Sequence, residues 1–193
     1  MEILVDDVIK EISTEIKNLE YLRNNESDKD KKFLLGALKN LYNYNRGIIA
    51  LLYCKELQNV ARLSYRTKEQ AILVDIPIDR SFLDQVLRGA FIIYAWMLLE
   101  YYFAEKVTDS DSMSTSSLIQ NYYSLEGKPV PPIISFFRET RNTSHQNGVY
   151  NKKKPPLSCV LDGKKYSLVP GQKVDFAHYP VLLSMVKESL KVL

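Results

Sequence analysis

The sequence of 193 residues has few cysteines and none of the short motifs that would place it in a familiar enzyme class. Its two cysteines, Cys54 and Cys159, lack CxxC spacing and have no histidine close by in the sequence, so we expect two reduced thiols rather than a zinc site or a catalytic cysteine. There is no Walker loop, dinucleotide fingerprint, HExxH or GxSxG motif, and no internal repeat. The sequence therefore predicts neither a metal nor an organic cofactor.

A long apolar run and a basic leader are also missing. The longest apolar stretch, from Gly89 to Leu99, lies between Arg88 and Glu100 and is shorter than the roughly 20 residues that span a bilayer. Residues 1–7 are acidic where a secretory signal is basic. With 46% hydrophobic and 25% charged residues, the composition is ordinary for a soluble domain. We therefore expect a cytoplasmic protein without membrane contact, in which residues 89–99 lie in the central core helix.

Apolar residues recur at helical spacing through most of the chain. The predicted helices cover residues 2–24, 30–63, a segment from 79 or 81 to 107, and 115–123, with loops at 64–79 and 108–112. Pro131-Pro132 favours the first turn of a further helix, which Asn147-Gly148 ends because glycine readily takes the left-handed conformation.

The pattern changes after Gly148. Short strands are predicted at 157–161, 166–169 and 174–176, with turns at Asp162-Gly163 and Pro170-Gly171, followed by a last helix over 179–193. The predicted fold is one mainly α domain over residues 1–193. It comprises a long-helix bundle (1–127), a helix that carries the candidate site (128–148), and a basic β-hairpin with a C-terminal helix that packs back on the bundle (149–193).

The candidate site is a polar stripe on the helix after Pro132. Residues three or four apart are neighbours on a helix, so Arg138, Arg141, Asn142 and His145 share one stripe. His145 is one of only two histidines in the chain. An alternative without function is that Arg138 pairs with Glu139, Arg141 caps carbonyls, and His145 bonds to backbone.

Through Arg141-Asn142 followed by His145, this segment resembles the HEPN superfamily of helical nucleotide-binding domains found in toxin, antiphage and RNA-processing systems. Members typically carry an arginine, a polar residue and a histidine on a late helix, usually with about four to six residues between arginine and histidine. Here three residues separate Arg141 from His145, and the six-residue spacing is met by Arg138, which Glu139 follows.

The resemblance implies a HEPN-like bundle, a homodimer with its motifs facing the seam, and metal-independent RNase chemistry. In such chemistry His145 would transfer a proton, because the pKa of imidazole lies near neutrality. Arg141 and Arg138 would hold the phosphate, and Asn142 would orient the imidazole or contact phosphate. A toxin-like nuclease of this kind could be restrained by an antitoxin-like or regulatory protein.

Charge gives an independent indication. Residues 1–127 carry 15 Lys and Arg against 19 Asp and Glu, whereas residues 128–193 carry 11 against 4. Lys152, Lys153 and Lys154 follow the candidate helix, and Tyr150 lies beside them. Basic side chains attract phosphate backbones and aromatic rings stack on unpaired bases, so these four residues are candidates for contact with single-stranded RNA; a solvated loop is the alternative.

Two functions remain open from the sequence. The first is a HEPN-like, metal-independent ribonuclease or toxin-like protein that targets RNA. The second is a noncatalytic HEPN-like dimer that binds RNA, a nucleotide or a protein, and the short spacing between Arg141 and His145 favours it.

Overall fold

The computed structural model describes residues 5–53, 80–144, 148–151 and 153–193. These residues form six α-helices, one short 3-10 helix and two strands. Their bounds are α1 Val5–Asn25, α2 Lys29–Tyr53, α5 Arg80–Lys106, η1 Ser110–Ser112, α6 Thr115–Leu125, α7 Pro132–Ser144, β1 Leu157–Leu161, β2 Lys164–Leu168 and α8 Tyr179–Lys191. The prediction of a mainly helical chain with a small β-hairpin and a C-terminal helix is confirmed.

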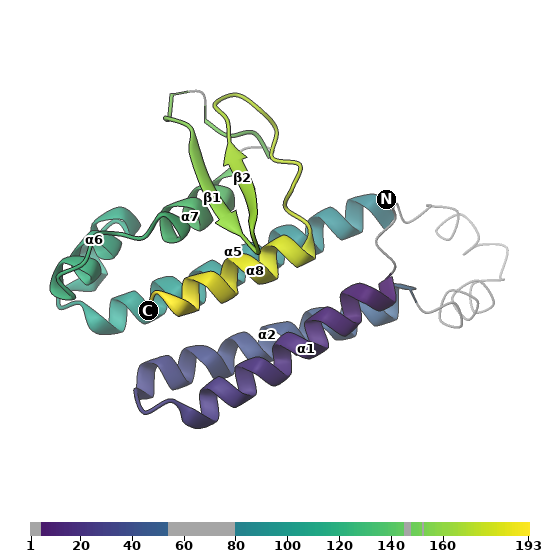
Figure 1. Ribbon diagram of the computed structural model, residues 1–193, viewed down its shortest axis with the longest axis horizontal. Coiled ribbons are helices and arrows are strands. Elements are labelled where there is room, and N and C mark those ends of the chain that lie inside the picture. The colour runs from purple at the N-terminus through teal and green to yellow at the C-terminus, as the bar shows by residue number, and fades with distance from the viewer. Residues whose placement is uncertain (1–4, 54–79, 145–147, 152) are drawn as a thin grey trace, which may run out of the picture.

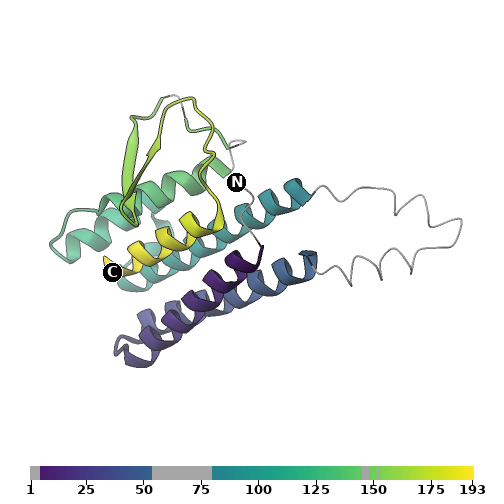
Figure 2. The same cartoon turned by 45° about the vertical axis from the view of Figure 1, so that its right-hand side comes forward.

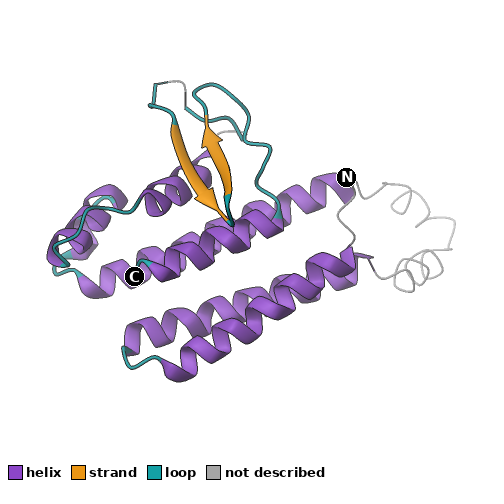
Figure 3. Cartoon of the chain, in the orientation of Figure 1, coloured by secondary structure: helices purple, strands orange, loops and turns teal. Residues whose placement is uncertain are grey.

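The long helices form the body of the molecule. In Figure 1, α1 lies in front of α2 and α8 lies in front of α5, while α6 and α7 occupy the side of α5 away from α2. The hairpin stands over α7 and α8, on the side away from α1 and α2 (Figures 2 and 3). This arrangement makes α5 the central helix, in contact with α2, α6, α7 and α8.

Aromatic side chains account for the packing around α5. The Trp96 ring is fully buried and meets Phe137 of α7 at a centroid distance of 5.4 Å. Phe91 contacts Tyr42 of α2 at 5.3 Å and Tyr179 of α8 at 5.9 Å. Each buried ring removes a large apolar area from water and has a preferred contact geometry, so these contacts help to fix how the helices pack.

The apolar segment of α5 also bears on membrane contact. Among the described residues, Gln85–Lys106 is the one segment whose length and composition would allow a membrane crossing. The core helix of a soluble protein meets the same criteria. Trp96, Leu99 and Phe103 are fully buried, as the prediction of a central core helix requires.

Asp28 fixes the start of α2. Its Oδ1 accepts the backbone N–H groups of Asp30 at 2.9 Å and of Lys31 at 3.2 Å, which is the role of a helix N-cap. The Lys106 ammonium at the end of α5 reaches Asp28 Oδ2 at 2.8 Å and Asp30 Oδ2 at 2.7 Å. These two carboxylates raise the pKa of Lys106 to about 12. The junction between α1 and α2 is thereby tied to α5.

The hairpin turns at the predicted Asp162-Gly163. Both residues have positive φ, 47° and 77°, as a two-residue hairpin turn of the primed kind needs. The strands are antiparallel, with Leu157 opposite Leu168 and Leu161 opposite Lys164. Leu161 and Leu168 are buried against the helices, so the hairpin is part of the same hydrophobic core as the bundle.

The predicted strand at 174–176 is wrong. The only pairing of this segment among the described residues is an isolated bridge between Lys173 and Val149. The alternation of apolar residues there has another cause, because Phe176 stacks on Phe136 at 5.7 Å and contacts Tyr166 at 5.4 Å. Two other predictions, the continuation of the second helix to residue 63 and the loop at 64–79, lie outside the described residues.

Candidate functional site

The candidate site lies along the second half of α7. The helix buries Ile133, Ile134, Phe136 and Phe137 in the core, which leaves its other side at the edge of the bundle. Thr140 and Thr143, near the end of the helix, are also buried. The Thr140 hydroxyl donates to the Phe136 carbonyl at 2.8 Å. The described residues of the predicted polar stripe therefore lie on a helix whose other side is packed in the core.

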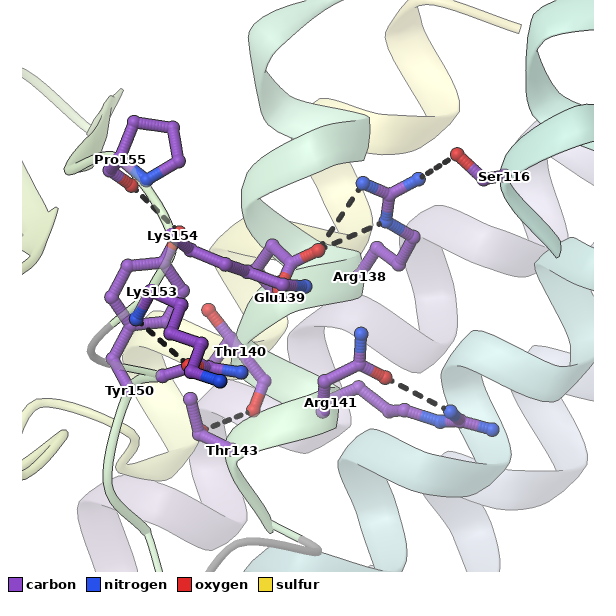
Figure 4. A network of polar contacts seen from close by, with 12 residues as sticks. Ser116, Arg138, Glu139, Thr140, Arg141, Thr143, Tyr150, Lys153, Lys154 and Pro155 are labelled. Atoms are coloured by element: carbon purple, nitrogen blue, oxygen red, sulfur yellow. Dashed lines mark hydrogen bonds and ion pairs between the residues drawn. The ribbon is translucent and has the colours of Figure 1, made fainter. Parts of the chain in front are cut away.

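Glu139 organises the polar contacts of α7 (Figure 4). Its side chain is only 4% exposed, and its two oxygens bind different cations. Oε1 accepts from Nε and Nη2 of Arg138 at 3.3 and 3.2 Å, and Oε2 accepts from Nζ of Lys154 at 2.5 Å. A buried carboxylate costs free energy unless it is paired, so these two cations stabilise it.

Arg138 is therefore held in place. Besides its pairing with Glu139, its Nη1 donates to Ser116 Oγ of α6 at 3.0 Å. For Arg138 the structure agrees with the alternative stated from the sequence, in which this residue pairs with Glu139. The sequence contained this signal, because the two residues are adjacent, but adjacency alone does not predict that Glu139 is buried or that Lys154 joins it.

Arg141 has a different environment. Its Nη1 donates to the neutral Asn142 Oδ1 at 3.1 Å, and none of the ion pairs among the described residues involves it. Its Nε is buried and has no hydrogen-bond partner within the described part of the chain. Figure 4 shows the side chain extending from α7 toward α5. Arg141 thus carries a positive charge that no described carboxylate offsets. Asn142 lies beside the Arg141 guanidinium, as predicted.

His145 and Lys152 lie outside the described residues. The predicted end of the helix is supported by Gly148, which has φ of 74° and whose N–H donates to the Thr143 carbonyl at 2.9 Å. A glycine with positive φ that bonds back to the last turn is the usual way to close a helix.

The candidates for RNA contact after α7 are not equivalent. Tyr150 is 1% exposed and its hydroxyl donates to the Pro155 carbonyl at 2.8 Å, so its ring is a core residue and offers no face to a base. Lys154 is committed to Glu139. Lys153 is exposed, and its backbone N–H is held by Asn151 Oδ1 at 2.9 Å. The exposed lysines of the hairpin and the following loop are Lys164, Lys165 and Lys173.

These side chains define the chemistry that the described site can perform. Arg141 and Lys153 can bind a phosphate or another anion, and Asn142 can donate or accept a hydrogen bond. No group of three metal-ligating side chains occurs among the residues the structure describes. Cys159 is a partly buried free thiol whose pKa is raised by burial, which makes it a poor nucleophile.

No protein-family model matches this chain, and neither a curated protein nor a solved structure is significantly similar to it.

Proposed function

We propose that this protein is a HEPN-like, metal-independent endoribonuclease in which Arg141 binds the phosphate and His145 transfers the proton. The observation that carries this proposal is the guanidinium of Arg141, which no described carboxylate neutralises although its Nε is buried. Arg141 is partly buried, and shielding its Nε from water without a hydrogen-bond partner costs free energy that an anionic ligand would offset.

The reaction follows from what RNA cleavage requires. The 2′-hydroxyl loses its proton and attacks the adjacent phosphorus, the bond to the 5′-oxygen breaks, and that oxygen takes up a proton. The products are a 2′,3′-cyclic phosphate and a 5′-hydroxyl. The planar fork of Arg141 suits the negative charge that develops on the phosphate oxygens, and Asn142, bonded to Nη1, helps to fix that fork.

One imidazole cannot readily act as base and acid in the same cleavage, so the proposal includes a homodimer that contributes a second His145. Exposed Lys153 and the exposed hairpin lysines would attract the RNA backbone without regard to sequence. Phosphate binding of this kind needs no metal ion.

The test is cleavage of a labelled single-stranded RNA in EDTA by the wild type and by Arg141→Ala and His145→Ala. We expect both variants to lose at least about 100-fold in rate, and the products to end in a cyclic phosphate. Arg23→Ala, an exposed arginine on α1, is the matched control and should cleave normally. Cleavage that persists in Arg141→Ala would refute the assignment of the phosphate-binding residue.

A second function is favoured by Glu139. Glu139 pairs with both Arg138 and Lys154, so only part of the predicted cation cluster is free to bind an anion. This supports a noncatalytic HEPN-like dimer that binds RNA, a nucleotide or a protein. A substrate with a 2′-deoxy sugar separates the two functions, since it removes the nucleophile and leaves the phosphates. Equal binding of the RNA and of its 2′-deoxy counterpart, with no cleavage of either, would favour the noncatalytic function.

A further inference from the structure

We infer that the free edge of β1 binds an extended, acidic segment of a partner protein, which adds to the hairpin as a third strand. Within the described part of the chain the sheet has two strands, so β1 pairs with β2 on one side only. In Figure 1, α6 and α7 lie on the side of β1 away from β2. An exposed strand edge offers a row of backbone donors and acceptors to which an extended peptide can add.

The hairpin register places free backbone groups on this edge. Because the turn has two residues, Leu161 and Lys164 form a hydrogen-bonded pair, and such pairs then alternate along the strands. Ser158 and Val160 belong to the other kind of pair, so their N–H and C=O groups point away from β2. Among the described residues these groups have one partner, the Cys159 thiol, which donates a weak hydrogen bond to the Val160 carbonyl at 3.7 Å. The edge is therefore available for pairing.

The sequence of β1 does not protect this edge. Natural edge strands often carry charged residues or proline, which oppose pairing with another chain. Residues 157–161 contain neither, and Val160 is 61% exposed. In contrast, β2 begins with Lys164 and Lys165. The unprotected edge of the hairpin is therefore that of β1.

An open, mainly apolar groove of about 410 Å³ follows the same edge. Residues 158–160 of β1 line it. Successive side chains of a strand point to opposite faces, so a groove that touches three consecutive residues runs along the edge and not over one face. Residues 131–133, at the start of α7, and Val192, after α8, form the rest of the lining. A hairpin of a second copy would bring its own second strand into the start of α7, so the groove suits a single extended chain.

Charge indicates the chemistry of the bound segment. Lys165 of β2 also lines the groove, is exposed, and takes part in none of the ion pairs among the described residues. Glu188 of α8 is close enough to Cys159 to raise the pKa of its thiol, but Lys191 pairs with this carboxylate at 2.5 Å. Residues 128–193 carry 11 Lys and Arg against 4 Asp and Glu. A segment that places apolar side chains in the groove and a carboxylate near Lys165 is complementary to this surface.

The test selects short peptides from a displayed random library on the full chain and measures the labelled peptides by fluorescence anisotropy. We expect recovered peptides to alternate apolar residues and to contain aspartate or glutamate. Ser158→Pro should weaken binding at least about tenfold, because proline removes the N–H that faces the groove and leaves the ladder to β2 intact. Ser167→Pro is the matched control, since Ser167 lies opposite Ser158 and its N–H faces the other edge of the hairpin. It should bind normally.

Two further measurements separate strand addition from other kinds of binding. Lys165→Glu should weaken binding about tenfold, whereas Lys173→Glu, at an exposed lysine in the loop after β2, should not. N-methylation of alternate amides of the best peptide needs no variant protein. One alternate set should abolish binding and the other should have little effect, because only one edge of an added strand faces β1. Far-ultraviolet circular dichroism checks that each variant keeps its fold.

Four results would overturn the inference. They are the recovery of no binding peptide, binding that Ser158→Pro leaves unchanged, equal effects of the two N-methylated sets, and a wild-type dimer that Ser158→Pro dissociates. The last result would make a second copy the occupant of the edge. The inference does not rest on ribonuclease activity, because RNA cleavage and peptide binding are measured separately and either can fail alone.

Discussion

The substitution Glu139→Gln tests whether one buried carboxylate holds α7 and the loop before β1 together. The change keeps the shape of the side chain but removes its charge, and it leaves Arg138 and Lys154 without their shared partner. Breaking a buried ion pair by removing one member costs about 3–5 kcal/mol. Because Arg138 is 24% and Lys154 39% exposed, both cations can partly turn to water, so we expect a loss of about 2–3 kcal/mol.

In a chain of this length each kcal/mol lowers the melting temperature by about 2–4 °C, so Glu139→Gln should melt about 5–10 °C below the wild type. Urea unfolding measures the free energy of unfolding, and scanning calorimetry measures the melting temperature. The matched control is Glu188→Gln, which removes an exposed ion pair with Lys191 on α8 and should cost less than about 0.5 kcal/mol. If Glu139→Gln were no more destabilising than this control, the claim that Glu139 holds the site together would be refuted.

Three further predictions concern other parts of the fold. Asp28→Ala should lose about 1–2 kcal/mol in urea unfolding because it removes the N-cap of α2 and the partner of Lys106, whereas Asp28→Asn should keep the cap and lose less. Burial lowers the pKa of His178, so the unfolded state binds the proton more readily; the unfolding free energy should fall as pH drops below about 6.5, and His178→Gln should remove that part of the pH dependence. Gly163→Ala should cost about 1 kcal/mol in thermal unfolding because φ is 77°, and Gly163→Asn should cost less because asparagine tolerates that conformation.

The helical fold was predictable because each described helix carries its own periodic pattern and end signals. Proline before α7, the Asp162-Gly163 turn and the apolar centre of α5 all specify local structure, and the structure has each of them. Phe176 was misassigned to a strand because alternation does not distinguish a strand from an extended segment that packs on helices. Tyr150 was misassigned to the surface because basic neighbours do not reveal that its ring packs in the core.

The candidate site was less predictable because its contacts cross from one element to another. Lys154 follows α7 by ten residues, and only the fold brings its ammonium to Glu139. Sequence spacing could place Arg138 and Arg141 on one stripe, but it could not show that one is neutralised and the other is not. Burial of the carboxylate decides this difference, and burial depends on the whole bundle.

That difference sharpens the two functional alternatives. Arg138 has the six-residue separation from His145 that the HEPN resemblance calls for, yet it is bound to Glu139 and Ser116. Arg141 is uncompensated but lies closer to His145 in the sequence. A phosphate would therefore have to displace a buried carboxylate to reach Arg138, whereas it can meet Arg141 without that cost. If this protein cleaves RNA, Arg141 rather than Arg138 is the arginine on which the rate should depend.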